Sequence, residues 1–153
     1  MGNDDYMTPR SAWETIDAYL PKDKLIWEPF YGNGESGKNL AKLGCEVIHK
    51  PVDFFDNNLG DVIVSNPPFS KVAKILKRLK EIGKPFILIM SQQKLNTKYY
   101  RDLFGNDPEM AILVPPKRIH FTPNGNDSRK SRCSFDCFYY CWKMGIDRQM
   151  IHL

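Results

Sequence analysis

The sequence predicts a single α/β domain built on a mostly parallel β-sheet. Three strongly apolar segments, 62–64, 86–90 and 110–114, are separated by stretches with helical periodicity, an alternation typical of this class. The chain has 153 residues, of which 42% are hydrophobic, enough for one domain with a substantial core. We treat 1–153 as one domain, since no linker, internal repeat or low-complexity segment interrupts it.

The first predicted helix begins at Thr8 and Pro9. Thr8 suits the N-cap and Pro9 the first helical position, because a proline there loses no intrahelical hydrogen bond. Trp13, Ile16 and Leu20 recur at helical spacing, so this helix packs one face inward. A proline directly after Leu20 ends the helix.

A short apolar strand at 25–27 runs into a turn that holds Gly32 and Gly34, and a helix is predicted over 35–43. Glycines at this spacing let a backbone turn sharply and approach a ligand closely. A second short strand follows at 45–48. The turn between the first strand and the helix is therefore a candidate cofactor loop.

The next strand, 61–65, ends at a rigid loop made of Asn66, Pro67, Pro68 and Phe69. Consecutive prolines fix φ at both positions and remove backbone donors, so carbonyls in the loop are free to accept. The Asn66 side-chain oxygen and the Pro67 carbonyl suit the hydrogens of an exocyclic amino group. Phe69 suits stacking on an extruded base. The alternative is a surface turn with a buried phenylalanine.

The rest of the chain alternates again and then changes character. Helical periodicity with a basic opposite face runs over 70–82, and another helix is predicted over 95–104. After the apolar strand 110–114, the segment 118–121 alternates and 134–142 is a long aromatic strand. We predict that these last two segments pair as an antiparallel hairpin at the edge of the sheet.

Four cysteines are present, and Cys133, Cys137 and Cys141 are spaced four residues apart. In a strand these three would share one face with Tyr139. No further cysteine or histidine stands at a zinc-like interval, so we predict buried thiols and no metal site.

The net charge of +4 and the pI near 8.8 are compatible with a polyanionic partner. Basic residues gather directly after the double proline and again near the C-terminus, and these groups flank the candidate base pocket. The first group is Lys71, Lys74, Lys77, Arg78, Lys80 and Lys84, and the second is Lys117, Arg118, Arg129, Lys130 and Arg132. The candidate nucleic-acid contacts among them are Lys71, Lys74, Arg118, Arg129, Lys130 and Arg132.

The sequence gives no sign of a membrane or secretory segment. It contains no run of about 18 or more apolar residues, and its first residues are polar and acidic. We therefore expect a cytoplasmic protein.

The loop Asn66-Pro67-Pro68-Phe69 after a strand resembles the catalytic motif of the amino methyltransferases that use S-adenosylmethionine. The adenine-N6 enzymes carry this motif as Asn/Asp-Pro-Pro-Tyr/Phe/Trp. The resemblance implies a class I methyltransferase-like, Rossmann-like fold, with a doubly wound sheet and cofactor and base above the carboxyl ends of its strands. It also implies that Asn66, Pro67, Pro68 and Phe69 are the catalytic residues and that Asn66 lies close to the cofactor.

Three upstream segments resemble the cofactor site of the same family. The loop Glu28-Pro29-Phe30-Tyr31-Gly32-Asn33-Gly34 is similar to the loop that faces the amino-acid part of the cofactor. Thr8-Pro9 resembles an element that holds the methionine end. Asp53-Phe54 resembles the pair that meets the adenine, with Asp53 accepting from its amino group and Phe54 lying against the ring.

The second strand departs from the family pattern. Class I methyltransferases usually end this strand with an acid that binds the ribose, whereas this chain has His49-Lys50-Pro51. No helix fits between this point and the strand at 61–65, so a whole crossover is missing. Asp53 is an alternative ligand for the ribose.

The resemblance implies transfer of a methyl group to the N6 amino group of adenine in DNA. RNA is the first alternative substrate, and a protein glutamine amide ranks lower. A catalytically silent subunit that binds nucleic acid or a partner is the alternative from another class. We expect no separate recognition domain within 1–153, and we therefore expect short loops, a second copy of the chain or a partner subunit to supply specificity.

Overall fold

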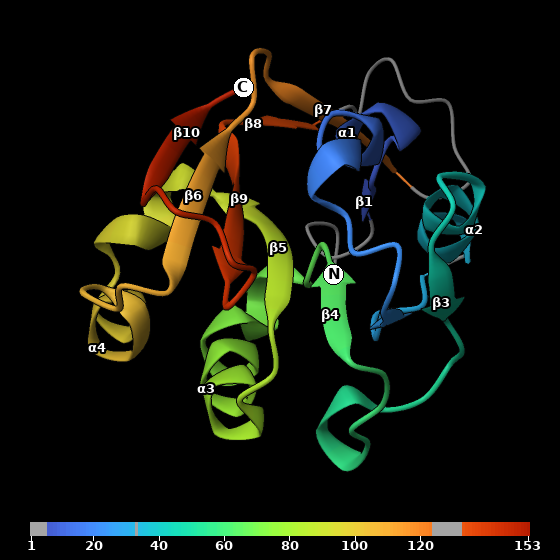
Figure 1. Cartoon of the computed structure of the whole chain (residues 1–153), viewed down its shortest axis with the longest axis horizontal. Coiled ribbons are helices and arrows are strands. Elements are labelled where there is room, and N and C mark those ends of the chain that lie inside the picture. Colours follow the sequence, from blue (N-terminus) through green and yellow to red (C-terminus); the bar gives the residue numbers. More distant parts are fainter. Residues whose placement is uncertain (1–5, 33, 124–132) are drawn as a thin grey trace.

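A seven-stranded sheet forms the centre of the computed structural model, which describes residues 6–32, 34–123 and 133–153 (Figure 1). Its strand order is β10-β6-β9-β5-β4-β2-β3, and β9 is antiparallel to both neighbours while every other adjacent pair is parallel. The predicted α/β class with a mostly parallel sheet is therefore confirmed. The strands are β2 (Leu25–Trp27), β3 (Glu46–Ile48), β4 (Val62–Ser65), β5 (Phe86–Ser91), β6 (Met110–Val114), β9 (Cys137–Trp142) and β10 (Met150–His152).

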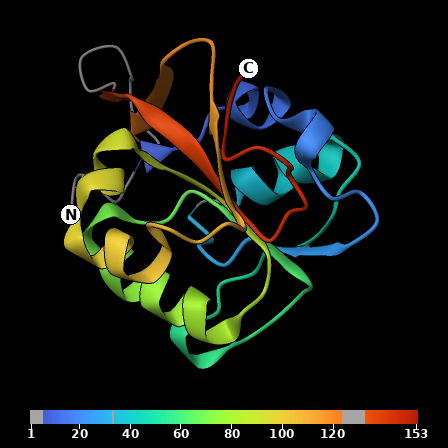
Figure 2. The ribbon, with the colours of Figure 1, turned by 60° about the vertical axis from the view of Figure 1, so that its left-hand side comes forward.

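Helices cover both faces of this sheet, as a doubly wound fold requires (Figure 2). The helices α1 and α2 pack on one face, where Trp13 and Leu40 are fully buried. The helices α3 and α4 pack on the other face through residues such as Ile75 and Phe104. The bounds are α1 (Arg10–Glu14), α2 (Glu35–Lys42), α3 (Val72–Ile82) and α4 (Lys98–Phe104), with short 3-10 helices η2 (Asp17–Tyr19), η3 (Phe54–Asp56), η4 (Phe69–Lys71) and η5 (Gln92–Asn96).

The predicted loss of a crossover is confirmed. Between β3 and β4 the chain forms only η3, and within the described residues no strand pairs with the outer side of β3. Side chains elsewhere must therefore hold the segment that joins these strands.

The predicted hairpin forms, but its place at the edge of the sheet is wrong. The tail divides at Asp136, and β7 (Ile119–Pro123), β8 (Cys133–Phe135) and β1 (Tyr6–Met7) make a separate three-stranded sheet. The strand β9 lies between β5 and β6 because both of its faces are apolar, as a central position requires. The strand at this edge of the sheet is instead β10, and we did not predict this strand from the sequence.

Cys45, Cys137 and Cys141 are buried free thiols, as predicted. Cys137 and Cys141 share a face of β9 with Tyr139 and belong to the core under α1 and α2. In the part of the chain that the structure describes, no helix is long and apolar enough to cross a bilayer.

Candidate active site

Asn66 lies directly after β4, at the carboxyl end of a strand flanked by β2 and β5. Its Nδ2 donates a hydrogen bond to the Thr8 Oγ1, 3.1 Å away. Its Oδ1 is buried and accepts no hydrogen bond from the described residues. Such an unpaired acceptor costs about 1–3 kcal/mol, so it needs a reason to persist. Binding of a donor at this point is one such reason.

The double proline holds this asparagine on a stiff turn. Pro67 is buried, Pro68 is half-buried, and the Pro68 carbonyl accepts from the Lys71 backbone N–H at 3.3 Å. Phe69 is half-buried at the start of η4. The motif therefore forms the strand-to-helix loop that the sequence predicted.

Thr8 reaches Asn66 because it does not cap α1. The N-cap is Pro9, whose backbone is extended and whose side chain makes no capping hydrogen bond, so the predicted cap at Thr8 is wrong. Antiparallel pairing of β1 with β7 places Thr8 beside the loop that follows β4. The structure thus joins two segments that lie 58 residues apart in the sequence.

Glu28 connects the candidate cofactor loop to the candidate catalytic loop. Its Oε1 accepts from the Ser65 hydroxyl at 2.6 Å and from the Phe30 N–H at 3.0 Å, and its Oε2 accepts from the Ser36 hydroxyl at 3.1 Å. Ser65 is the residue directly before Asn66. Burial raises the pKa of Glu28 to about 8, although these three hydrogen bonds favour the carboxylate.

This buried carboxyl predicts a specific dependence of stability on pH. The folded protein holds the Glu28 proton up to about pH 8, whereas the unfolded chain releases it near 4.5. The free energy of unfolding should therefore fall as pH rises through this window, by on the order of 1 kcal/mol per pH unit from this group. Glu28→Gln should flatten the profile, as measured by urea unfolding at about pH 5 and about pH 8. Equal slopes for parent and variant would contradict the assignment.

The loop itself turns through glycines in the left-handed region. Gly32 has φ +57° and Gly34 has φ +87°, and the Gly34 N–H donates to the Tyr31 carbonyl at 2.9 Å. Of the described residues, a Cβ on Gly32 would meet only the Met7 Cε, at 3.4 Å, so these residues leave space beside this glycine. Gly34 is the N-cap of α2. Pro29 follows Glu28 at the carboxyl end of β2, and Asn33 lies outside the described residues.

His49 takes the strand-end position at which the family usually carries its ribose acid. Its Nδ1 lies 3.0 Å from the Glu28 carbonyl and its Nε2 lies 3.0 Å from the Tyr31 carbonyl. The ring stacks on Tyr31, with centroids 4.8 Å apart. Burial lowers the pKa of His49, and a neutral ring can donate to only one of the carbonyls. His49 therefore supports the candidate cofactor loop, and it does not replace the acid that class I methyltransferases usually use to bind the ribose.

The place of His49 depends on a glycine in α2. A Cβ on Gly37 would lie 2.4 Å from the His49 Cγ. Alanine normally stabilises a helix by about 1 kcal/mol relative to glycine, but here we expect Gly37→Ala to lower the free energy of unfolding by about 1–3 kcal/mol.

A double-mutant cycle measured by urea unfolding tests this contact. Adding His49→Ala to Gly37→Ala should recover part of the lost stability, because the clash is then absent. A stabilising Gly37→Ala would show that the imidazole does not lie over α2.

The segment at Asp53 and Phe54 forms η3. Asp53 is exposed and caps this short helix, with its Oδ1 accepting from the Phe55 N–H at 2.7 Å. Phe54 is only 3% exposed, and its ring lies 5.6 Å from Trp27 and 5.2 Å from Phe30. Phe54 thus anchors an aromatic cluster on which Phe30 is half-buried and Phe55 exposed.

The basic residues after the double proline divide into two kinds. Lys71, Lys74 and Lys77 are exposed on η4 and α3. The side chains of Arg78, Lys80 and Lys84 instead donate to backbone carbonyls of the protein.

Of the predicted contacts in the second basic group, the structure describes only Arg118. Its Nε donates to the Asp136 Oδ1 at 2.9 Å and its Nη2 donates to the Asp136 Oδ2 at 3.2 Å. The segment that holds Arg129, Lys130 and Arg132 lies outside the described residues.

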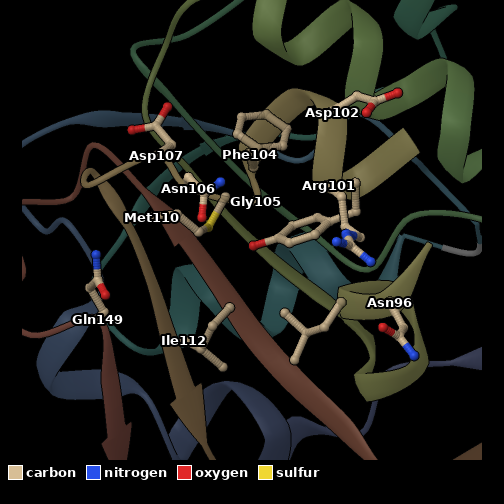
Figure 3. A pocket seen from close by; sticks show the side chains of 12 residues that line it. Asn96, Arg101, Asp102, Phe104, Gly105, Asn106, Asp107, Met110, Ile112 and Gln149 are labelled. Carbon is tan, nitrogen blue, oxygen red and sulfur yellow. The ribbon is translucent and has the colours of Figure 1, made fainter. Parts of the chain in front are cut away.

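A pocket of about 620 Å³ lies between α4 and β6 (Figure 3). Asn96, Arg101 and Asn106 line it together with Met110 and Ile112. None of the predicted catalytic or cofactor residues contributes to its lining. The pocket is therefore separate from the candidate active site.

No protein-family model and no curated protein matches the sequence. Among solved structures, the chain is similar to the protein described as a "putative RNA methyltransferase" from Pyrococcus horikoshii, with a TM-score of 0.58. That match has 19% identity and covers 90% of this chain and 86% of the other. A precorrin-6y C5,15-methyltransferase from Geobacter metallireducens matches with a TM-score of 0.44 and 13% identity, covering 94% of this chain and 96% of the other.

The chain has a class I methyltransferase-like fold. The antiparallel strand β9 between β5 and β6, and the mostly parallel order around it, give the Rossmann-like arrangement that the resemblance implied. The fold places the loops after β2 and β4 next to each other, since these strands are paired neighbours.

Several residues of the site were missed by sequence reasoning. The hydroxyls of Ser36 and Ser65 hold Glu28, and the Trp13 Nε1 donates to the Ser36 Oγ at 3.1 Å. Ser65 gave one available signal, because it is a polar residue at the end of an otherwise apolar strand. Ser36 and Trp13 gave none, since their roles depend on the packing of α1 against α2.

Proposed function

We propose that the protein transfers a methyl group from S-adenosylmethionine to the N6 amino group of adenine in DNA. The observation that carries the proposal is the buried Asn66 Oδ1, which accepts no hydrogen bond from the described part of the chain, with the amide held by Thr8 through Nδ2. An adenine amino group would supply the missing donor. The residues of the motif resemble those of the adenine-N6 enzymes, and their placement at the carboxyl end of β4 agrees with that role.

The residues of the candidate cofactor loop fit this cofactor. Open space beside Gly32 allows the backbone to approach a ligand, and a side chain there would fill that space. Glu28 provides a buried carboxyl that accepts from the Ser65 hydroxyl and so ties this loop to the residue directly before Asn66. Phe30, half-buried against the Phe54 ring, provides aromatic surface for an adenine ring, and Asp53 provides an exposed carboxylate.

S-adenosylmethionine supplies an electrophilic methyl sulfonium when bound. Asn66 Oδ1 and the Pro67 carbonyl would accept the two amino hydrogens and direct the nitrogen lone pair out of the ring plane. Phe69 would clamp the base by stacking. Catalysis in this scheme is mainly positioning and electrostatics, and no strong general base is required because the proton can leave after transfer.

DNA is our proposed substrate because the Glu28–Gly34 loop and the Thr8-Pro9 element resemble those of the DNA adenine enzymes. The contact between Thr8 and Asn66 supports a joint role for these segments. Sequence specificity would come from short loops, a second copy of the chain or a partner subunit.

Methylation assays with labelled cofactor on DNA, RNA and protein pools test the proposal. Label in DNA supports the proposal. Label in RNA alone would mean that RNA is the substrate of the same reaction. Label in protein would point to a glutamine amide. Binding of nucleic acid without cofactor binding by calorimetry would identify a silent subunit and overturn the enzymatic proposal.

We also expect DNA binding to depend on salt through the exposed lysines Lys71, Lys74 and Lys77. Each phosphate contact should add about 0.9 to the slope of log affinity against log salt concentration. Replacing all three lysines by glutamine should therefore flatten the slope, as measured by fluorescence anisotropy. Replacing Lys98, an exposed lysine paired with Asp102 on α4, serves as a control and should leave the slope unchanged. A flat profile for the parent would contradict an electrostatic contact.

A further inference from the structure

The segment from Asp53 to Gly60 joins β3 to β4 without a crossover helix. In the proposed function this segment carries the adenine wall of the cofactor site. The contacts that hold this segment in place therefore matter more for the site than they would in a fold that keeps the crossover helix. Two cations from outside the segment hold it, one at each end.

Arg78 of α3 holds the first end. Its Nε donates to the Phe54 carbonyl at 3.0 Å and its Nη2 donates to the Asn57 carbonyl at 2.7 Å. Its Cζ also lies 5.5 Å from the centre of the Phe54 ring. The planar guanidinium donates to both carbonyls in a fixed geometry while it lies over the ring.

We propose that Arg78 is the positioning residue that sets the adenine wall of the cofactor site in place of the missing crossover. It orients Phe54, which supports Phe30 at 5.2 Å and Phe55 at 5.2 Å. This inference rests on the proposed function, because the wall is useful only if a ligand with an adenine ring binds there. Arg78 touches no reacting atom and acts through the Asp53–Asn57 backbone.

Lys84 provides a matched control within the same segment. Its Nζ donates to the Gly60 carbonyl at 2.7 Å and the Leu59 carbonyl at 3.4 Å, and it is half-buried like Arg78. Both cations fix carbonyls of the β3–β4 connection, but Lys84 does so where the chain enters β4. A purely structural role predicts the same consequences for loss of either cation.

The test compares Arg78→Met, Arg78→Lys and Lys84→Met in the full chain. Calorimetry with S-adenosylhomocysteine should give a Kd about tenfold or more higher for Arg78→Met, while Lys84→Met stays within about twofold of the parent. The Kd of Arg78→Lys should lie between the values of these two variants. Arg78→Lys also keeps the fold if Arg78→Met does not. In methylation assays Arg78→Met should raise the KM for S-adenosylmethionine and leave kcat nearly unchanged, since the methyl end is held elsewhere.

The outcomes separate the inference from the function on which it rests. A parent that fails to bind S-adenosylhomocysteine overturns both. A parent that binds it, with equal Kd changes in Arg78→Met and Lys84→Met, overturns the role of Arg78 alone. A fall in kcat without a rise in KM would also overturn it, because Arg78 would then act on the chemical step.

Discussion

Replacing Asn66 by alanine is expected to lower the rate of methyl transfer by about 10²–10³-fold, the usual cost of losing one preorganised polar contact to a transition state. The reason is the loss of Oδ1, the buried acceptor that the described residues leave unpaired. Binding of S-adenosylmethionine should change little, because the alanine keeps the loop and its prolines. Single-turnover rates and calorimetry measure the two effects separately.

Asn66→Asp is the matched variant, since the carboxylate keeps an acceptor at Oδ1 and the adenine-N6 enzymes that this motif resembles can carry aspartate at this position. It should retain more activity than the alanine variant, although it can no longer donate to Thr8 as the amide does. Circular dichroism run alongside distinguishes a lost contact from a lost fold. An Asn66→Ala protein that methylates as fast as the parent would make this loop structural.

Gly32→Val is expected to abolish cofactor binding. The valine brings a Cβ and two methyl groups to a backbone with φ +57°, in the space beside the loop where a ligand must approach. Among the residues that the structure describes, this Cβ would meet only the flexible end of Met7, at 3.4 Å. The principal structural cost is therefore backbone strain of about 1–2 kcal/mol.

Gly145→Val controls for that strain. Gly145 has φ +72°, and a Cβ there would meet none of the described residues within 4 Å, so the substitution strains the backbone away from the candidate site. We expect similar losses of stability in urea unfolding for the two variants, and loss of cofactor binding in calorimetry only for Gly32→Val. Unchanged binding by a folded Gly32→Val protein would mean that the cofactor loop has been misplaced.

Local features of the sequence predicted most of the sheet. The apolar runs of β4, β5 and β6 are long enough to identify strands, and their continuous hydrophobicity follows from burial on both faces. Prolines and glycines marked the loops after β2 and β4 because their backbone restrictions act locally. The missing crossover was visible because too few residues separate β3 from β4.

Local sequence patterns did not predict the features that depend on pairing between distant segments. The pattern of residues 134–142 predicts one strand. In the structure, Asp136 separates two strands, β8 and β9, that belong to different sheets. Thr8 looked like a helix cap because its neighbours favour a helix, whereas pairing of β1 with β7 directs it to Asn66.

The basic cluster after the double proline shows a related limit. A lysine and an arginine on the same helix look alike in sequence, but Lys74 is exposed while Arg78 folds back onto carbonyls that only the tertiary structure brings near. The sequence therefore predicted that this helix face is basic, but not that Arg78 binds backbone carbonyls of the segment between β3 and β4.

The identity of the methylated nucleoside is the most direct test of the central claim. DNA incubated with the protein and methyl-labelled S-adenosylmethionine would be digested to nucleosides and analysed by mass spectrometry, with the Asn66→Ala protein as the control. We predict label in N6-methyl-2′-deoxyadenosine for the parent and a loss of about 10²–10³-fold for the variant. Label at another atom or base, or equal labelling by both proteins, would contradict the assignment of Asn66 to the adenine amino group.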